Sequence, residues 1–422
     1  MRAISVLVPA VFAAVAIANT VPLPLHQLQK RAELETCSDL TVSNNNGNRK
    51  VVIVIDSSGS MSTADRSNLR LSAARALNDF LIANSEAKGG KKADQVAVVG
   101  FGSSAYTVFG PGDPGNPDAN AAISGITIGG GTYIAGGMYE AMDHIAAMNG
   151  ETKDRSAIVV FTDGADSDTP RLVNAISNAT SQGIRVSFGY LDRTASAQPT
   201  AVLHALRESK GVYATITVAA GSQNFVNYVL LNGLTSQDNP QGAGDRLLAG
   251  LATTQFISGS NPITLKYSAE KGEAANFTVV SFTNDRLTVE AKIGGQTFRP
   301  VTSTASVRQF LNLTAPSGGT LEVTVSASTP PKDGLFSVST NSNQPIKNCT
   351  VGVSGSGSSG LTAGAKAGVG IGVTFLVAGL LAGGVYAYKH LFAAASNASP
   401  PPVINNGAPS VPPPAEASPG WY

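Results

Sequence analysis

The sequence predicts a doubly wound α/β fold with a mainly parallel sheet, followed by an antiparallel β-sandwich and one transmembrane helix. Three observations support this prediction. Residues 51–55, and residues 157–161 of an expected strand at 157–162, are apolar without alternation, which is typical of strands buried on both faces. After about residue 249 the apolar residues instead alternate with period two, as in half-buried antiparallel strands. Residues 367–388 contain no charged side chain.

The α/β part is expected to cover residues 48–234. Strand-like and helix-like patterns alternate along it, which predicts parallel strands with helices on both faces of the sheet. A Gly- and Pro-rich stretch at 110–118 is predicted to be a loop. The expected strands are 51–55, 95–101, 106–109 at an edge, 157–162, 185–191 and 212–218, and the expected helices are 71–81, 138–148, 169–181, 199–209 and 222–233.

The second part is expected to cover residues 249–347, after a polar linker. Its clearest alternation places Leu287, Val289, Ala291 and Ile293 on one face of a strand. Some seven or eight short strands fit this length, and an antiparallel β-sandwich is the predicted arrangement.

The first residues have the features of an export signal. One basic residue precedes an apolar run that ends at an A-x-A-like site, so residues 1–18 are predicted to be a signal peptide, with a membrane anchor as the alternative. Residues 19–31 form a possible pro-segment that ends in Lys30-Arg31. This pair resembles a furin- or kexin-type processing site, and a plain basic surface pair is the alternative.

The C-terminal segment is predicted to anchor the chain in a membrane. Residues 350–366 are Gly- and Ser-rich and predict a flexible stalk. As a helix, residues 367–388 would span roughly 33 Å, enough for a bilayer core, with a buried soluble helix as the alternative. The tail at 389–422 is Pro-rich and predicted to be disordered. The predicted topology is a single-pass type I cell-surface protein with an extracellular N-terminal part.

The predicted membrane span also contains two G-x-x-x-G pairs, Gly368 with Gly372 and Gly379 with Gly383. Such pairs can form a helix–helix contact, so a homodimer is one interpretation. Small residues scattered through an Ala- and Gly-rich span are the alternative.

Oxygen donors follow the first strand of the α/β part. Asp56, Ser58 and Ser60 stand two residues apart, just past the carboxyl end of the strand, where open α/β sheets bind ligands. Thr132 lies in a Gly-rich loop, and Asp163 follows the strand at 157–162. Hydroxyls and carboxylates are hard ligands, so the sequence predicts a site for Mg²⁺, or alternatively Ca²⁺ or Mn²⁺. A helix N-cap is the other interpretation of Asp56 and its serines.

The order and spacing of these residues resemble a known family. Asp-x-Ser-x-Ser, then Thr after about seventy residues, then Thr-Asp-Gly after about thirty more, is similar to a von Willebrand factor type A domain with its metal-ion-dependent adhesion site. The resemblance covers residues 48–234. It implies that Ser58, Ser60 and Thr132 ligate the ion by hydroxyl, and that Asp56 and Asp163 bind it directly or through water. It also implies a partner that supplies an acidic group to the ion.

The resemblance implies metal-dependent adhesion to, or recognition of, an extracellular protein or matrix ligand. The alternative is an accessory subunit of a membrane channel or transporter. Calcium-activated chloride channel regulators similarly combine a type A domain with β-sandwiches, but their protease part has no counterpart here. Asp166 and Asp168, near the predicted site, are expected to form a solvated acidic loop.

Neither an enzyme nor a nucleic-acid-binding protein is indicated. The net charge of +1 provides no basic surface for nucleic acid. Neither H-E-x-x-H nor G-x-S-x-G occurs in the sequence. The four histidines, His26, His144, His204 and His390, do not belong to a recognisable catalytic pattern.

Two kinds of covalent modification are expected in an exported chain. Cys37 and Cys349 flank the two folded parts and are predicted to form a disulfide, with two free thiols as the alternative. Four predicted extracellular sequons are candidate glycosylation sites, of which Asn348 is doubtful because Cys349 follows it. These sites are Asn178, Asn276, Asn312 and Asn348, whereas Asn397 should face the cytoplasm and stay unmodified.

Overall fold

The computed structural model of the chain describes residues 35–43, 46–191, 198–242, 244–302, 309–329 and 331–354, which belong to one compact unit. The predicted signal peptide, pro-segment, transmembrane helix and tail lie outside these residues. No helix in the described ranges is long and apolar enough to span a bilayer. Residues 350–354 of the predicted stalk form a strand, because they pair with a strand near the N-terminus.

The α/β part is built on parallel strands, as predicted. Strand β2 pairs in parallel with β3 on one side and β5 on the other, and β4 runs antiparallel to β3 at the edge. The sheet continues from β5 through β6 to β7. The strands of this part are β2 (Lys50–Asp56), β3 (Gln95–Phe101), β4 (Ala105–Gly112), β5 (Ser156–Thr162), β6 (Ile184–Tyr190) and β7 (Tyr213–Ile216).

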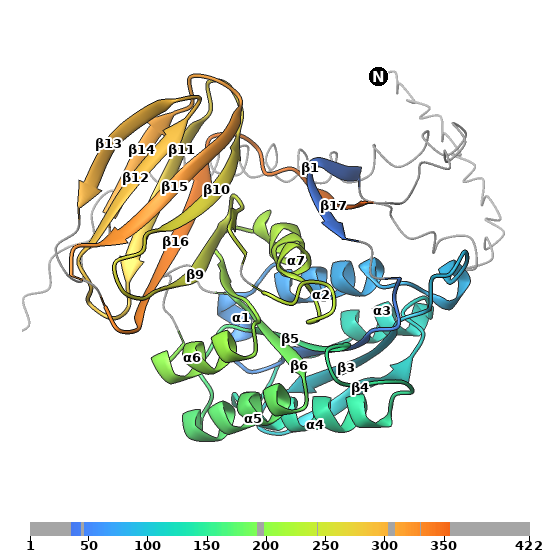
Figure 1. Cartoon of the computed structure of the whole chain (residues 1–422). Coiled ribbons are helices and arrows are strands. Elements are labelled where there is room, and N and C mark those ends of the chain that lie inside the picture. The colour runs from blue at the N-terminus through green and yellow to red at the C-terminus, as the bar shows by residue number, and fades with distance from the viewer. Residues whose placement is uncertain are drawn as a thin grey trace, which may run out of the picture. The chain divides into compact units, whose positions relative to one another are not determined.

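Helices cover both faces of this sheet (Figure 1). Val51, Ile53 and Ile55 of β2 belong to the core on the side of α2 and α7, whereas Val52 and Val54 belong to the core on the side of α4 and α5. Both sets are fully buried, which explains why β2 is apolar at every position. The helices are α1 (Met61–Ala64), α2 (Leu69–Phe80), α3 (Pro117–Ser124), α4 (Ile134–Ala147), α5 (Thr169–Ser181), α6 (Thr200–Glu208) and α7 (Gly221–Asn232), with a 3-10 turn η2 (Asn84–Glu86).

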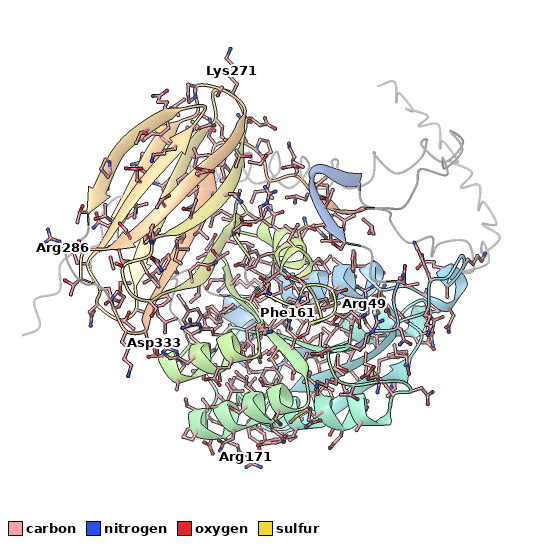
Figure 2. The ribbon with its side chains drawn as sticks, viewed as in Figure 1. Arg49, Phe161, Arg171, Lys271, Arg286 and Asp333 are labelled. Carbon is pink, nitrogen blue, oxygen red and sulfur yellow. A yellow bond between two sulfur atoms is a disulfide. The ribbon has the colours of Figure 1, made fainter. Side chains whose placement is uncertain are left out.

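Side chains fill the space between sheet and helices. Figure 2 shows Phe161 inside the α/β part and Arg171 at its outer surface. The ring of Phe161 on β5 packs edge-on against Phe225 of α7, with centroids 5.3 Å apart. Helix α3 lies partly in the stretch predicted to be a loop. It begins at Pro117, and the side chain of Asn116 caps it by accepting a hydrogen bond from the Asp118 amide.

The remainder is β-rich. A five-stranded sheet has the order β13-β12-β15-β10-β8, and its apolar side chains share one core with β9, β11, β14 and β16. Leu287, Val289, Ala291 and Ile293 all lie in this core, as the period-two pattern predicts. The strands are β8 (Arg246–Leu247), β9 (Leu251–Ile257), β10 (Ile263–Ala269), β11 (Ala274–Ser281), β12 (Leu287–Ile293), β13 (Gln296–Thr302), β14 (Gln309–Thr314), β15 (Gly319–Ala327) and β16 (Gly334–Ser342).

One sheet joins the two parts. Strand β9 pairs antiparallel with β7, with Ala214 opposite Thr253 and Ile216 opposite Leu251. The resulting ten-stranded sheet has the order β14-β11-β16-β9-β7-β6-β5-β2-β3-β4. The two parts are therefore connected by backbone hydrogen bonds as well as by the chain that links them.

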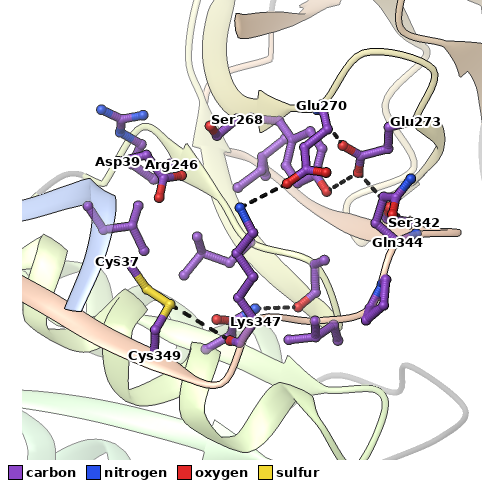
Figure 3. A pocket seen from close by; sticks show the side chains of 18 residues that line it. Cys37, Asp39, Arg246, Ser268, Glu270, Glu273, Ser342, Gln344, Lys347 and Cys349 are labelled. Carbon is purple, nitrogen blue, oxygen red and sulfur yellow. Dashed lines mark hydrogen bonds and ion pairs between the residues drawn. A yellow bond between two sulfur atoms is a disulfide. The ribbon is translucent and has the colours of Figure 1, made fainter. Parts of the chain in front are cut away.

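The predicted disulfide between Cys37 and Cys349 is present. It joins β1 (Glu35–Ser43) to β17 (Cys349–Ser354), which pair in parallel, and it links residues 312 positions apart in sequence. The Asn227 side chain of α7 donates a 2.8 Å hydrogen bond to the Cys349 carbonyl. Figure 3 shows the disulfide close to Lys347, whose ammonium lies 2.9 Å from Glu270 Oε1.

We expect the double variant Cys37→Ala with Cys349→Ala to lose about 2–5 kcal/mol of unfolding free energy, because the closed loop restricts the unfolded chain. Urea unfolding of the purified protein measures this loss. Reducing the unsubstituted protein serves as the control and should shift its midpoint in the same direction. An unchanged midpoint in both samples would contradict the prediction.

Candidate metal centre

The two predicted carboxylates lie at the same edge of the sheet. Strand β2 ends at Asp56, and β5 ends at Thr162, directly before Asp163. These strands are parallel neighbours, with Ile55 opposite Phe161, so their carboxyl ends meet. Asp56 is fully buried, whereas Asp163 is partly exposed.

Hydrogen bonds link four of the five predicted ligands. The hydroxyls of Ser58 and Ser60 are 2.9 Å apart, and Ser60 Oγ donates to Asp163 Oδ1 at 2.9 Å. Asp56 Oδ1 accepts from the Ser58 amide at 2.7 Å, and its Oδ2 accepts from Thr162 Oγ1 at 2.7 Å. The four side chains thus form one polar cluster.

The helix-cap interpretation does not explain this cluster. Ser60 occupies the N-cap position of α1, but its side chain makes no capping hydrogen bond. Its hydroxyl instead donates across the sheet edge to Asp163, which is 103 residues away in sequence. Ser60 therefore connects two strand ends.

The Gly-rich loop is held against the end of β2 by its backbone. The Gly59 amide donates to the Gly130 carbonyl at 3.0 Å, and the Gly129 amide donates to the Ser57 carbonyl at 2.6 Å. Gly130 has a φ of +83°, and a Cβ at Gly102 would lie only 2.8 Å from the Gly129 carbonyl oxygen. Gly130 is therefore needed for its positive φ, and Gly102 is needed because a side chain there would collide with the loop.

Thr132 is brought to the same place by that loop. Its side chain lies beside Gly164. A Cβ atom added to Gly164 would be 3.7 Å from Thr132 Oγ1. The Thr132 carbonyl accepts from the Ser167 amide at 3.1 Å, which ties the loop to the segment after β5. The structure thus places Thr132 next to the residue that follows Asp163.

The electrostatics of the cluster suit a cation. In the described part of the chain, neither Asp56 nor Asp163 has a salt-bridge partner. Burial raises the pKa of Asp56, and the nearby Asp163 raises it further, against the lowering by hydrogen bonds from Ser58 and Thr162. Burial also raises the pKa of Asp163 above its ordinary value. A bound cation would offset this cost of keeping both groups ionised.

The donor set fits a hard divalent ion. The described residues contain no group of three or more His, Cys, Asp or Glu side chains that could hold a metal. Three of the five donors here are hydroxyls, which do not belong to those four residue types. Two carboxylates and three hydroxyls suit Mg²⁺, Ca²⁺ or Mn²⁺ and not the nitrogen and sulfur preference of zinc.

Residues 51–165 match the sequence model of the von Willebrand factor type A domain. This chain therefore has a type A domain, and the match covers less than half of its length. No curated protein matches the chain.

Solved structures that match parts of this chain come from several organisms. A conserved hypothetical protein BatB from Bacteroides thetaiotaomicron is 19% identical, with a TM-score of 0.33, and covers 42% of this chain and 95% of its own. A von Willebrand factor type A protein from Catenulispora acidiphila is 12% identical, with a TM-score of 0.36, and covers 73% of this chain and 67% of its own. The manganese-loaded TRAP protein of Plasmodium vivax is 15% identical, with a TM-score of 0.29, and covers 35% of this chain and 58% of its own.

Cation binding by the type A domain is expected to weaken in acid. Protons compete with the cation, and they begin to do so at a higher pH than the ordinary aspartate value of 3.8, because the pKa of Asp56 and of Asp163 is raised. Without a cation, the folded protein favours the protonated form of these two aspartates more than the unfolded chain does. The resulting stabilisation is fully present below the aspartate pKa of the unfolded chain, and it is lost as the pH rises through the higher pKa values of the folded protein. With a cation, ionisation is favoured and the sign reverses.

We therefore expect the Tm difference between samples with Mg²⁺ and with EDTA to shrink as the pH falls from about 7 towards the aspartate range. Thermal unfolding at a series of pH values measures it. The variant Asp163→Asn should show a much smaller difference at every pH. A Tm difference independent of pH would contradict the assignment of these carboxylates.

Two further residues support the site, and the sequence analysis did not assign them. Thr162 donates to Asp56, as described above. Arg70 of α2 is fully buried; its Nε donates to the Asp56 carbonyl at 2.8 Å and its Nη1 to Asp65 Oδ2 at 2.7 Å. The Thr-Asp-Gly motif contained a signal for Thr162. No local pattern marks Arg70, because its partners are set by the packing of α2.

The acidic loop prediction was wrong for Asp166. This side chain is buried and accepts hydrogen bonds at 2.6 Å from the amides of Ala135 and Asp168. It thereby holds the first turn of α4 next to the loop of Thr132. Asp168 is exposed and caps α5 by accepting from the Arg171 amide at 3.1 Å.

The histidines do not form a recognisable catalytic triad in the described ranges. His144 Nε2 lies 2.8 Å from Thr107 Oγ1 and 3.6 Å from Glu140 Oε1. In a hydrolytic triad the acid orients the other ring nitrogen. Here the carboxylate approaches the same nitrogen as the hydroxyl. His26 and His390 lie outside the described residues.

A separate cavity of about 470 Å³ lies beside the disulfide, and Figure 3 shows its lining. None of the five predicted metal ligands lines it. The predicted ligands lie instead at the sheet edge, where Gly59 and Ser60 are exposed. An open site can admit a side chain from another protein.

Proposed function

We propose that this chain is a single-pass type I cell-surface protein, and that its type A domain binds an extracellular protein or matrix ligand through a divalent cation. Asp56, Ser58, Ser60, Thr132 and Asp163 would hold the ion, with Mg²⁺ favoured. The surface location rests on the predicted signal peptide at 1–18 and the predicted span at 367–388. No enzymatic activity is proposed.

The hydrogen-bonded connection from Ser58 through Ser60 to Asp163, beside buried Asp56, carries this proposal. It joins oxygen donors from two strand ends at a solvent-facing edge. Two carboxylates balance the charge of a divalent ion, and three neutral hydroxyls leave room in a six-ligand shell. An acidic group of a ligand can complete that shell. A site built from carboxylates alone would be negatively charged and would repel such a group.

The test is crosslinking at the surface of cells that express the full chain, in Mg²⁺ and in EDTA, followed by identification of captured partners. We expect a partner that is retained in Mg²⁺ and lost in EDTA, and lost also with Asp163→Ala. A partner retained equally in EDTA would contradict the metal route. Chelator-sensitive capture of a multi-span membrane protein would instead support the accessory-subunit role.

A further inference from the structure

Two sequons face each other across one pair of strands. Asn276-Phe277-Thr278 lies on β11 and Asn312-Leu313-Thr314 on β14. These strands pair antiparallel, with Asn276 directly opposite Asn312. Strand β14 is the last strand in the order of the ten-stranded sheet as described, whereas β11 also pairs with β16 on its other side. The two asparagines thus share a face but differ in the space around them.

The side-chain amide of Asn276 is used within the sheet. Its Nδ2 donates to Asn312 Oδ1, and its Oδ1 accepts from Thr278 Oγ1 at 3.1 Å. A sugar on Asn276 would replace one of the two hydrogens of Nδ2 and would have to fit between β14 and the Asn341 that lies opposite on β16. Asn312 takes part in the same contact through its oxygen, so its nitrogen is not the donor there.

A large aromatic side chain lies next to Asn312. Phe310 is 54% exposed, the most exposed large apolar residue of the described part. Alternation along β14 places Phe310 and Asn312 on the same face. Leu311 and Leu313 point the other way and are 4% and 6% exposed. A single exposed apolar residue needs no explanation by itself. Here, however, a sugar attachment site stands two residues away on the same face.

Phe310 and Asn312 lie on a strand at the edge of the sheet, where an exposed aromatic side chain needs cover. An edge strand with an exposed aromatic is prone to pair with another chain, and natural proteins protect such edges. The described face around Phe310 is mostly polar, and its nearest apolar neighbour there is the half-buried Val280 of β11, two residues from the Thr278 that lies opposite Phe310; the polar side chains are Asn276, Thr278, Asn312, Thr314, Ser339 and Asn341. The C–H face of a pyranose ring is apolar and can cover an aromatic ring.

We propose that Asn312 carries an N-linked glycan whose first sugar packs on Phe310 and covers the β14 edge, and that Asn276 keeps its amide for the contact between strands. The donor is a lipid-pyrophosphate-linked oligosaccharide. A bond forms between Asn312 Nδ2 and C1 of the first sugar, the bond from C1 to the pyrophosphate oxygen breaks, and the amide nitrogen gives up one proton. The lipid pyrophosphate is the leaving group. This inference rests on export of the chain and is independent of the metal site.

The test uses the full chain expressed in a eukaryotic secretory host, in four forms: unsubstituted, Thr314→Ala, Phe310→Ser, and both changes together. Thr314→Ala removes the sequon and retains Asn312. Glycopeptide mass spectrometry should find Asn312 occupied in the unsubstituted chain. Loss of the sequon should lower Tm by roughly 2 to 4 °C when Phe310 is present and should change it little in the F310S background.

Thr278→Ala is the matched control, because it removes the opposite sequon and should leave the Phe310-dependent stabilisation in place. Trimming the glycan to its first sugar should also preserve the stabilisation. The proposal is overturned if Asn312 is unmodified in the expressed chain, or if the Tm loss is the same with and without Phe310. It is equally overturned if Thr278→Ala, and not Thr314→Ala, removes the effect.

Discussion

Replacing Asp56 and Ser58 together by alanine is expected to weaken divalent-cation binding by at least about 100-fold, beyond the 10–100-fold typical of losing an outer-shell partner. The substitution removes one of the two carboxylates and the hydroxyl that bonds to Ser60. The remaining Asp163 cannot neutralise a divalent ion alone. Isothermal calorimetry with Mg²⁺ and Mn²⁺ on the purified protein measures the loss.

A matched control removes the same two residue types outside the predicted ligand set. Asp143 and Ser62 are exposed, and the Ser62 hydroxyl bonds only to the Gly59 carbonyl in the described part of the chain. The double variant Asp143→Ala with Ser62→Ala should therefore bind the cation as the unsubstituted protein does. Cation uptake that is equal in the two double variants would refute the site.

Folding must be separated from binding, because Asp56 is buried and its loss leaves the Thr162 hydroxyl without its acceptor. Ser60→Ala provides this separation. Ser60 is exposed and makes no helix-capping bond, so its removal should leave Tm within about 2 °C while it weakens cation binding. Intact binding in a folded Ser60→Ala protein would remove Ser60 from the ligand set.

Arg70→Met is expected to cost about 3–5 kcal/mol of unfolding free energy, the range for breaking a buried ion pair. Arg70 and Asp65 are both fully buried and lie 2.7 Å apart. Asp65 also caps α2 by accepting hydrogen bonds from the Leu69 and Arg70 amides. Loss of the guanidinium would leave this carboxylate charged and without its counter-ion. Urea unfolding measures the change.

Two comparisons test the cause of that loss. Arg75→Met, on the exposed side of the same helix, should change stability by no more than about 0.5 kcal/mol. The double variant Arg70→Met with Asp65→Asn should lose less than the sum of its two single variants, because the buried charge is removed together with its partner. Strict additivity would show that the two residues do not stabilise the fold as a pair.

Much of the fold could be predicted from local patterns. Strands β2, β3 and β5 and helix α5 lie where unbroken apolar runs and helical spacing predict them, because burial on both faces or on one stripe leaves a clear signature. Helix α3 was missed because it is short and begins within a Gly- and Pro-rich stretch. The pairing of β7 with β9 could not be predicted, since hydrogen bonding between strands leaves no periodicity in either strand.

The candidate site shows the same division. Asp56, Ser58 and Ser60 are adjacent in sequence, and their shared position at a strand end follows from local pattern alone. The pairing of β2 with β5 brings Asp163 to them, and backbone bonds from Gly59 and Gly129 bring the loop of Thr132. The resemblance to the type A family indicated these partners before the geometry did.

By itself, the sequence determined the types of oxygen donor, the two cysteines and the alternation of elements, because these depend on residue identity and short-range spacing. Only the tertiary structure decided that Arg70 and Thr162 hold Asp56, that Asp166 is buried, and that Asn276 opposes Asn312. Each of these depends on contacts between segments far apart in the chain. Such contacts are selected by the packing of the whole core, and no short stretch of sequence encodes them.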